Sequence, residues 1–267
     1  MKQKNKFIDF VAKQNFIKEM KVHEHIILWF GCAVSIIFFI IQLSWFKNAV
    51  NDWTVWLTLF ASISSVMFLL AGSKKKIICP VIGLIGAIFL LATSWERRLF
   101  GFVIMQGCNI VTQIIALIMW YHNSSNKATI QPKEAKLWMI LVYVAVIIGL
   151  SFLFAWVEGL EGFYKFWSGD PNATRQPYVI RIFESFSLML IVGSFFPMIK
   201  GYRFIWWLYA ACDVTMAITW AIRGITSADA GFTPEIYNCW STFFSNICML
   251  AACIISILNW NMPSRKR

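Results

Sequence analysis

Long apolar runs separated by short charged segments dominate the pattern of this sequence. A helix needs about 20 apolar residues to cross a bilayer, and eight runs are long enough. Basic clusters such as Lys74 to Lys76 and Lys200 to Arg203 mark where one run ends and the next begins. The pattern therefore predicts an all-α polytopic membrane protein, with spans at residues 27–46, 54–72, 77–95, 99–121, 137–156, 182–199, 204–222 and 237–260.

The distribution of Lys and Arg among the connecting segments predicts the orientation of the spans. With a cytoplasmic N-terminus, 17 of the 24 basic residues fall in inner segments and 7 in outer segments. Cytoplasmic loops of membrane proteins carry an excess of basic residues. We therefore expect a multi-pass cell-membrane protein with both termini in the cytoplasm. The net charge of +11 follows from this bias and does not indicate a nucleic acid partner.

The segments outside the spans give weaker signals. Residues 1–26 are interpreted as a cytoplasmic amphipathic N-terminal segment, with apolar side chains such as Phe7 and Phe16 between lysines, and residues 261–267 as a basic cytoplasmic tail. The longest outer loop, Val157 to Ile180, holds three glycines and two prolines, which predicts an irregular segment. The seven scattered cysteines are interpreted as packing residues, and no cofactor or metal motif is found.

Matching span endings indicate an internal repeat. The fourth span ends in IIALIMW at Trp120 and the eighth in IISILNW at Trp260, and this match places Gln106 opposite Asn246. The third and seventh spans also end alike, in ATSW and AITW. The sequence therefore predicts two copies of a three-helix unit.

The repeat predicts the arrangement of the whole chain. Residues 54–121 and 182–260 form the two repeats, 137–156 is the linker helix between them, and 27–46 is an additional N-terminal span. A single linker helix gives both copies the same orientation, so the repeat is parallel. Transporters with such repeats bind substrate near the bilayer midplane where the copies meet.

Two carboxylates and several aromatic side chains are predicted at membrane depth. Asp213 lies near the middle of the seventh span and Glu184 near the outer end of the sixth. Ionisable groups in a membrane are costly and by default face protein or a water-filled cavity. Trp206, Tyr209 and Asp213 share one helix face, which Trp220 continues. This face is a candidate binding surface.

Amides form a second stripe. Gln106, Asn109 and Gln113 share a face of the fourth span, and Asn246 lies on the eighth. Amides both donate and accept hydrogen bonds, and aromatic faces attract cations and flat rings. The expected ligand is a flat, possibly cationic ring with ribose-like polar groups. The alternative is that these side chains only join helices to one another.

The segment from residue 83 to residue 120, GLIGAIFLLATSWERRLFGFVIMQGCNIVTQIIALIMW, is similar to the Pnu family of bacterial nicotinamide riboside transporters. Gln106, Gln113 and Trp120 match that family's amide and closing tryptophan positions. In the second repeat the family signature WxxWxxxN reads Trp206, Tyr209 and Asp213. Two of these three positions differ from the signature, which leaves the substrate open. The resemblance covers residues 54–260.

The resemblance implies a SWEET-like fold, a homotrimer in the bacterial inner membrane, and a substrate site at the residues just named. It also implies facilitated diffusion of a nicotinamide riboside-like vitamin precursor, which a separate cytoplasmic kinase traps by phosphorylation. Thiamine, a nucleoside or a flavin is the alternative substrate, and proton coupling through a carboxylate is an alternative mechanism. A structural or receptor protein is a further alternative. An enzyme is disfavoured because no nucleophile–base pair or metal ligand set is found at membrane depth.

Overall fold

The computed structural model describes residues 13–46, 51–96, 100–124, 129–168, 177–226 and 234–261. Within these residues the chain is helical, apart from two isolated β-bridges, and eight helices are long and apolar enough to cross a membrane. The predicted fold class and spans are confirmed. The spans are α2 (Val22–Trp45), α3 (Trp53–Ser73), α4 (Cys79–Glu96), α5 (Phe100–Asn123), α6 (Leu137–Val157), α8 (Tyr178–Lys200), α9 (Ile205–Thr226) and α10 (Pro234–Asn261).

The long outer loop contains a helix that the sequence did not predict. Helix α7 (Glu161–Ser168) lies within the segment interpreted as irregular, so that prediction was wrong for these eight residues. Lys165 Nζ lies 2.5 Å from Glu161 Oε1, an (i, i+4) pair that supports a helix. The glycines and prolines that suggested irregularity lie mostly on either side of it.

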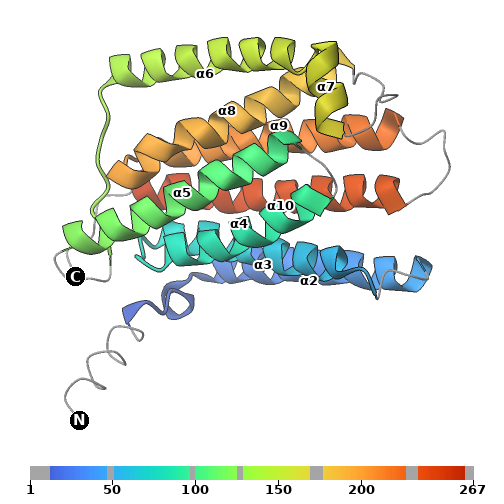
Figure 1. Cartoon of the computed structure of the whole chain (residues 1–267). Coiled ribbons are helices and arrows are strands. Elements are labelled where there is room, and N and C mark those ends of the chain that lie inside the picture. Colours follow the sequence, from blue (N-terminus) through green and yellow to red (C-terminus); the bar gives the residue numbers. More distant parts are fainter. Residues whose placement is uncertain are drawn as a thin grey trace.

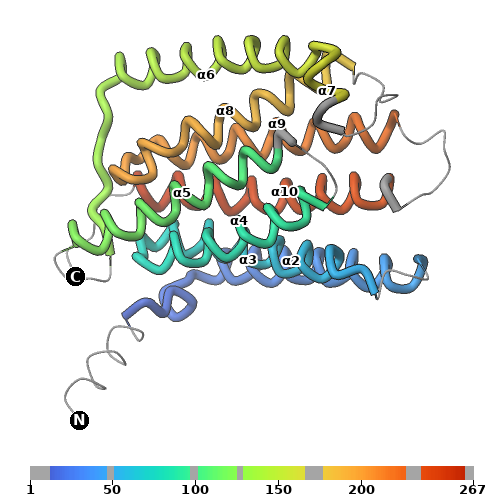
Figure 2. The backbone as a smooth tube through the Cα atoms, in the orientation of Figure 1, coloured from blue at the N-terminus to red at the C-terminus, as the bar shows by residue number. Residues whose placement is uncertain are grey.

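Six of the eight spans form a closed ring. Contacts join α3 to α4, α4 to α5, α5 to α8, α8 to α9, α9 to α10, and α10 back to α3. Helix α2 packs outside the ring against α3 and α10, and α6 packs outside against α8 (Figures 1 and 2). The additional N-terminal span and the linker helix therefore lie on opposite sides of the ring.

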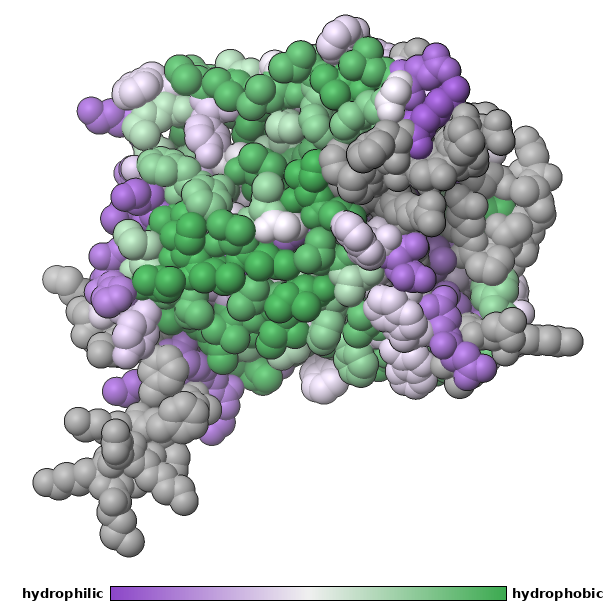
Figure 3. Space-filling model, viewed as in Figure 1, coloured by the Kyte–Doolittle hydropathy of each residue, from purple (hydrophilic) through white to green (hydrophobic). Residues whose placement is uncertain are grey.

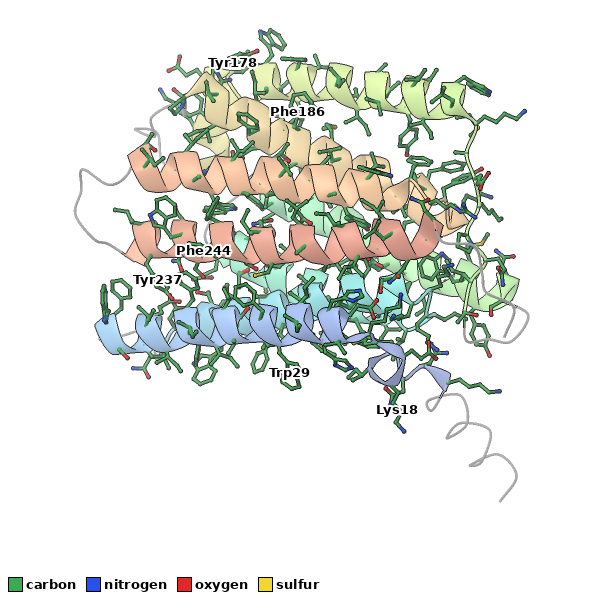
Figure 4. All side chains as sticks on the ribbon, turned by 180° about the vertical axis from the view of Figure 1, so that it is seen from behind. Lys18, Trp29, Tyr178, Phe186, Tyr237 and Phe244 are labelled. Atoms are coloured by element: carbon green, nitrogen blue, oxygen red, sulfur yellow. The ribbon has the colours of Figure 1, made fainter. Side chains whose placement is uncertain are left out.

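The outside of the bundle is suited to lipid. Figure 3 shows a hydrophobic belt across the middle of the molecule with hydrophilic residues toward both ends of the helices. Trp29 on α2 is exposed and points away from the bundle (Figure 4), whereas Phe38 on the same helix packs on Tyr237 and Phe244 of α10 at centroid distances of 5.7 and 5.5 Å. Apolar faces outside and polar contacts within are what a bilayer requires.

Two buried indole–carbonyl hydrogen bonds join the halves of the ring. Trp260 Nε1 of α10 donates to the carbonyl of Gly72 in α3 at 2.7 Å, and Trp120 Nε1 of α5 donates to the carbonyl of Met198 in α8 at 2.8 Å. Each bond joins the two predicted repeats, and each repeat supplies one indole donor and one carbonyl acceptor. This reciprocity supports the repeat, which stays a prediction.

The turns after α3 and α8 lie at the same end of the ring, the end predicted to face the cytoplasm. Both turns contain a left-handed residue, Lys75 with φ 59° and Gly201 with φ 70°. Residues 129–133, which we call the inner strap, bind both turns. Ile130 N donates to the Lys75 carbonyl at 3.0 Å, and Lys133 N donates to the Gly201 carbonyl at 2.8 Å.

The N-terminal segment packs on the same end. Within residues 14–21 the helical element is the 3₁₀ turn η1 (Ile17–Glu19), and Phe16 is buried in the core rather than facing lipid. The rest of the predicted amphipathic segment, residues 1–12, lies outside the described residues. The first span begins at Val22, five residues earlier than predicted.

Gly72 should not tolerate a larger side chain. A Cβ built there would lie 2.1 Å from Cη2 of Trp206. We expect Gly72→Ala to lower the free energy of unfolding by about 1–3 kcal/mol, the usual cost of overpacking a core. Thermal melting of purified protein in detergent measures this, with Gly107→Ala in α5 as the control because a Cβ there meets nothing within 4 Å. Equal losses in both variants would show that crowding is not the cause.

Candidate functional site

A polar cavity of about 110 Å³ lies inside the ring, between α3, α4, α5, α9 and α10. Its lining residues come from the beginnings of α3, α5 and α10 and from the ends of α4 and α9. The cavity therefore lies toward the end of the bundle that carries α7, which the basic residues predict to face outside. Among the described residues, no charged side chain lines it.

Eight of the lining residues carry hydroxyl groups, contributed by α3, α4 and α10. Several of these hydroxyls donate their hydrogen to a carbonyl of their own helix, a common arrangement of Ser and Thr in helices. A hydroxyl used in this way still has oxygen lone pairs to offer. The wall is therefore rich in acceptors. Such bonds of 2.8–3.0 Å are made by Thr58, Ser62, Ser65, Thr93 and Thr242.

Two amides face the cavity from equivalent helices. Gln106 of α5 and Asn246 of α10, which the sequence match placed opposite one another, both line it. Asn246 Nδ2 donates to the Thr242 carbonyl at 2.7 Å, which leaves its oxygen as an acceptor. Gln106 Oε1 accepts from Asn109 at 3.5 Å, and Asn109 in turn accepts from Gln113 Nε2 at 3.0 Å. The Gln106 amide nitrogen is therefore available to donate, while Asn109 and Gln113 support it from outside the cavity.

Trp220 of α9 supplies the main aromatic wall. Its ring lies 5.7 Å from Phe102, which also lines the cavity, and its buried Nε1 has no hydrogen-bond partner among the described residues. The sequence placed Trp220 on the same face as Asp213, but it was not selected as a site residue. The match between ATSW and AITW pairs Trp220 with Trp95, but Trp95 is 68% exposed. The residue of α4 that lines the cavity is Ser94, one position earlier.

Asp213 does not line the cavity. It is buried between α9 and α10, one turn closer to the inner end than Met216, which does line it. Its Oδ2 accepts from Cys253 Sγ at 3.3 Å. In this conformation its surroundings are those of a residue that joins two helices.

Trp206 and Tyr209 belong to a tightly packed cluster between the cavity and the inner end of the ring. With Phe68 and Trp260 they form what we call the inner aromatic cluster. The distance between ring centroids is 5.3 Å for Trp206 and Trp260, and 5.6 Å for Tyr209 and Phe68. Trp206 is 0% exposed. The cluster fills the ring between the cavity and the inner turns.

The remaining predicted site residues also lie outside the cavity. Trp120 is held at the inner end by its bond to Met198. Glu184 forms an ion pair with Arg223 of α9, whose guanidinium lies over the Trp220 ring at 5.4 Å. Glu184 therefore does not line the cavity. It contacts Arg223, which contacts the lining residue Trp220.

Helix α2 borders the same polar region. A smaller cavity of about 20 Å³ between α2, α3 and α10 shares Thr58 and Ser241 with the larger one. Gln42 of α2 donates to Asn238 of α10 at 3.5 Å near its outer end. The additional span therefore lines the smaller cavity, which its position outside the repeats did not predict.

A ring of membrane-spanning helices around a polar cavity is the architecture of a solute transporter, and the comparisons agree. A family model described as nicotinamide mononucleotide transporter matches residues 55–262. The chain belongs to this family, and the resemblance to Pnu transporters is confirmed. Its fold is similar to a solved structure titled crystal structure of the vitamin B3 transporter PnuC, with a TM-score of 0.64, 16% identity and coverage of 90% of this chain and 91% of that one. No curated protein matches the chain.

A half-buried carboxyl group at the outer end should make stability depend on pH. Glu158, just after α6, accepts from Ser185 Oγ at 3.1 Å. Burial, reinforced by the nearby charge of Glu184, raises the pKa of Glu158 from its ordinary value of 4.5 to about 7. The folded protein then binds a proton that the unfolded chain has released, so stability is expected to fall as pH rises from about 4.5 to about 7.

We expect Glu158→Gln to remove this part of the pH dependence. The variant and the wild type should melt alike near pH 4.5, and the variant should melt higher at pH 8, as measured by thermal unfolding in detergent. Glu96→Gln, an exposed carboxyl at the same end of the bundle, is the control. A wild-type melting temperature that rises between these pH values relative to Glu158→Gln would contradict the assignment.

Proposed function

We propose that this protein carries nicotinamide riboside into the bacterial cytoplasm by facilitated diffusion, and that cytoplasmic phosphorylation traps the imported molecule. Family membership and the fold support a transporter of this type. The observation that carries the choice of substrate is the cavity, which joins an acceptor-rich wall to Trp220, Gln106 and Asn246.

The cavity matches the chemistry of this substrate group by group. Nicotinamide riboside has ribose hydroxyls and a carboxamide nitrogen that donate, and the hydroxyl wall and Asn246 offer acceptors to them. Its carboxamide oxygen can accept from Gln106 or from the unpartnered indole N–H of Trp220. Its ring is flat and cationic, and the Trp220 face attracts such a ring.

The positive charge of the ring does not require a carboxylate in contact with it. The hydroxyl oxygens that line the cavity keep lone pairs, and these can share the compensation of the positive charge among several residues. Asp213, which the sequence places on the candidate binding surface, is not among the residues that line the cavity in this conformation. A cavity lined without ionisable groups also supports uncoupled transport over proton coupling.

Transport requires two movements away from the present conformation. Ligand pockets commonly measure about 300–1,000 Å³, so a cavity of about 110 Å³ takes a ring but not a whole nucleoside until the outer helix ends part. Release on the other side requires the inner aromatic cluster to open between Trp206 and Trp260. We propose that the predicted repeats rock against each other to do this, as in other transporters with internal repeats.

The proposed orientation has both termini in the cytoplasm. Asn259 Nδ2 of α10 donates to Glu24 Oε1 of α2 at 2.7 Å, so the first span begins beside the place where the last one ends. Most basic residues fall at that end. We also propose a homotrimer, for which the family resemblance is the support.

Uptake of radiolabelled nicotinamide riboside into proteoliposomes tests the proposal. The wild type should equilibrate the substrate across the membrane, and a proton gradient should not change the plateau. Trp220→Leu removes the aromatic face and an indole donor, so we expect the KM for uptake to rise by about 5- to 150-fold, the equivalent of about 1–3 kcal/mol for lost stacking. Trp95→Leu, the same change at an exposed position, should leave KM unchanged.

Other outcomes of this experiment reject specific parts of the proposal. If a proton gradient drives the substrate to accumulate inside the proteoliposomes, the transport is coupled to protons and is not facilitated diffusion. Transport of thiamine, uridine or riboflavin but not of nicotinamide riboside would reject the substrate. Equal effects of the two tryptophan substitutions would remove Trp220 from the site.

Asp213 and Gln106 should respond differently to substitution. We expect Asp213→Asn to keep the affinity for nicotinamide riboside within about twofold and to melt no lower than the wild type, because an amide costs less to bury than a carboxylate and can still accept from Cys253. Gln106→Leu should weaken binding by about 0.5–1.5 kcal/mol, the usual worth of one hydrogen bond. Calorimetric titration of both variants measures this, and a larger loss in Asp213→Asn would place Asp213 in the substrate site.

A further inference from the structure

Three consecutive lysines in the turn after α3 have different surroundings. Lys74 Nζ lies 2.5 Å from Glu24, and Lys76 Nζ lies 2.6 Å from Glu19. Lys75, between them, has no anionic partner among the described residues. Its side chain is half-buried, so its charge is neither paired nor fully hydrated.

The backbone at Lys75 is strained in a way that its counterpart avoids. Lys75 has φ 59°, and among the described residues it is the non-glycine residue with a positive φ. The corresponding turn after α8 has Gly201 at φ 70°, where glycine is free of the Cβ clash. Strained residues of this kind often have a functional side chain, which here is an unpaired ammonium group.

A second cation, Arg203, lies two residues after Gly201 in the corresponding turn after α8. The inner strap joins the two turns, since Ile130 N donates to the Lys75 carbonyl at 3.0 Å and Arg203 N donates to the Lys133 carbonyl at 2.9 Å. Arg203 Nη1 pairs at 2.8 Å with Glu134, which is itself 76% exposed. Arg203 Nε is buried and has no hydrogen-bond partner among the described residues.

The two cations disfavour each other. Burial lowers the pKa of Lys75, and the nearby Arg203 guanidinium lowers it further. Lys75 has no anionic partner among the described residues, and the exposed Glu134 pairs with Arg203 Nη1 but leaves the buried Arg203 Nε without a partner. An anion placed between Lys75 and Arg203 would supply a compensating charge.

We propose that Lys75 and Arg203 form an anion site at the inner end of the ring, and that its ligand is a phosphate ester. An ammonium and a guanidinium together suit the several oxygens of a phosphate group. Helix α3 ends at Ser73, so Lys75 lies just beyond the span, where the headgroups of the inner leaflet are expected. The phosphate can come from an anionic phospholipid or from a soluble compound, and it would brace the two inner turns in the closed conformation.

Two measurements on the full-length protein distinguish these sources. Native mass spectrometry in detergent compares the retention of phosphatidylglycerol with that of phosphatidylethanolamine. Thermal melting compares inorganic phosphate with chloride at equal ionic strength. We expect Lys75→Gln and Arg203→Gln each to weaken the binding of one of these anions by about tenfold, as for the loss of a hydrogen bond to a charged group. Lys200→Gln, an exposed lysine at the same end of α8, should have no effect.

A glycine variant separates anion binding from folding. Lys75→Gly relieves the backbone strain and removes the ammonium group together. Without anion it should melt no lower than the wild type, yet it should gain nothing from phosphate or phosphatidylglycerol.

Each outcome either tests whether the anion site exists or identifies the source of its phosphate. Selective loss of phosphatidylglycerol identifies a lipid headgroup, and selective loss of the phosphate-induced melting shift identifies a soluble ligand. If neither anion distinguishes the wild type from Lys75→Gln, the site does not exist. If Lys200→Gln loses as much binding as Lys75→Gln, the effect is one of general surface charge and the proposal is overturned.

Discussion

Two indole–carbonyl hydrogen bonds determine how the halves of this protein meet. A buried indole N–H in a bilayer is costly without an acceptor in the protein, and Trp120 and Trp260 have acceptors at the ends of α8 and α3. These bonds fix the axial position of α5 and α10. Gln106 and Asn246 each precede the anchored tryptophan by 14 residues, which is nearly four helical turns and about 21 Å. Both amides are therefore held at one level and on the inward face, where they line one cavity.

The chemistry of that cavity follows from how a helix satisfies its own hydroxyl groups. Thr58, Ser62 and Ser65 donate to carbonyls one turn earlier and keep their lone pairs free. A wall built this way attracts donors and positive charge without a buried carboxylate, whose desolvation would be costly. The carboxylates of this chain are used elsewhere. Asp213 accepts from Cys253 between two helices, and Glu184 orients Arg223 at the outer end.

The two halves of the ring contribute different side chains to the cavity and to the inner turns. Helix α3 lines the cavity with hydroxyl groups, whereas α8 contributes none of the lining residues. The polar region accordingly extends toward the contact between α3 and α10, where α2 lines the smaller cavity. At the inner end the same asymmetry recurs, with Lys75 where the other turn has Gly201. The proposed substrate and phosphate sites thus both draw on the two predicted repeats. The first supplies Gln106 and Lys75, and the second supplies Asn246, Trp220 and Arg203.

The sequence by itself determined the number of spans, their approximate bounds and the facing positions of Gln106 and Asn246. Span length and charge follow from what a bilayer requires of each segment, and matched endings come from comparing two segments of the sequence. None of these properties depends on which helices are neighbours in the fold. The sequence could not determine that Trp206 seals the ring while Trp220 lines the cavity, or that Glu184 has an arginine partner. In a chain whose helices are apolar on nearly every face, hydrophobicity does not specify rotation about the helix axis. Only the tertiary structure decided it, through the close packing of Trp206 on Gly72 and the hydrogen bonds between helices, because these contacts join residues far apart in sequence.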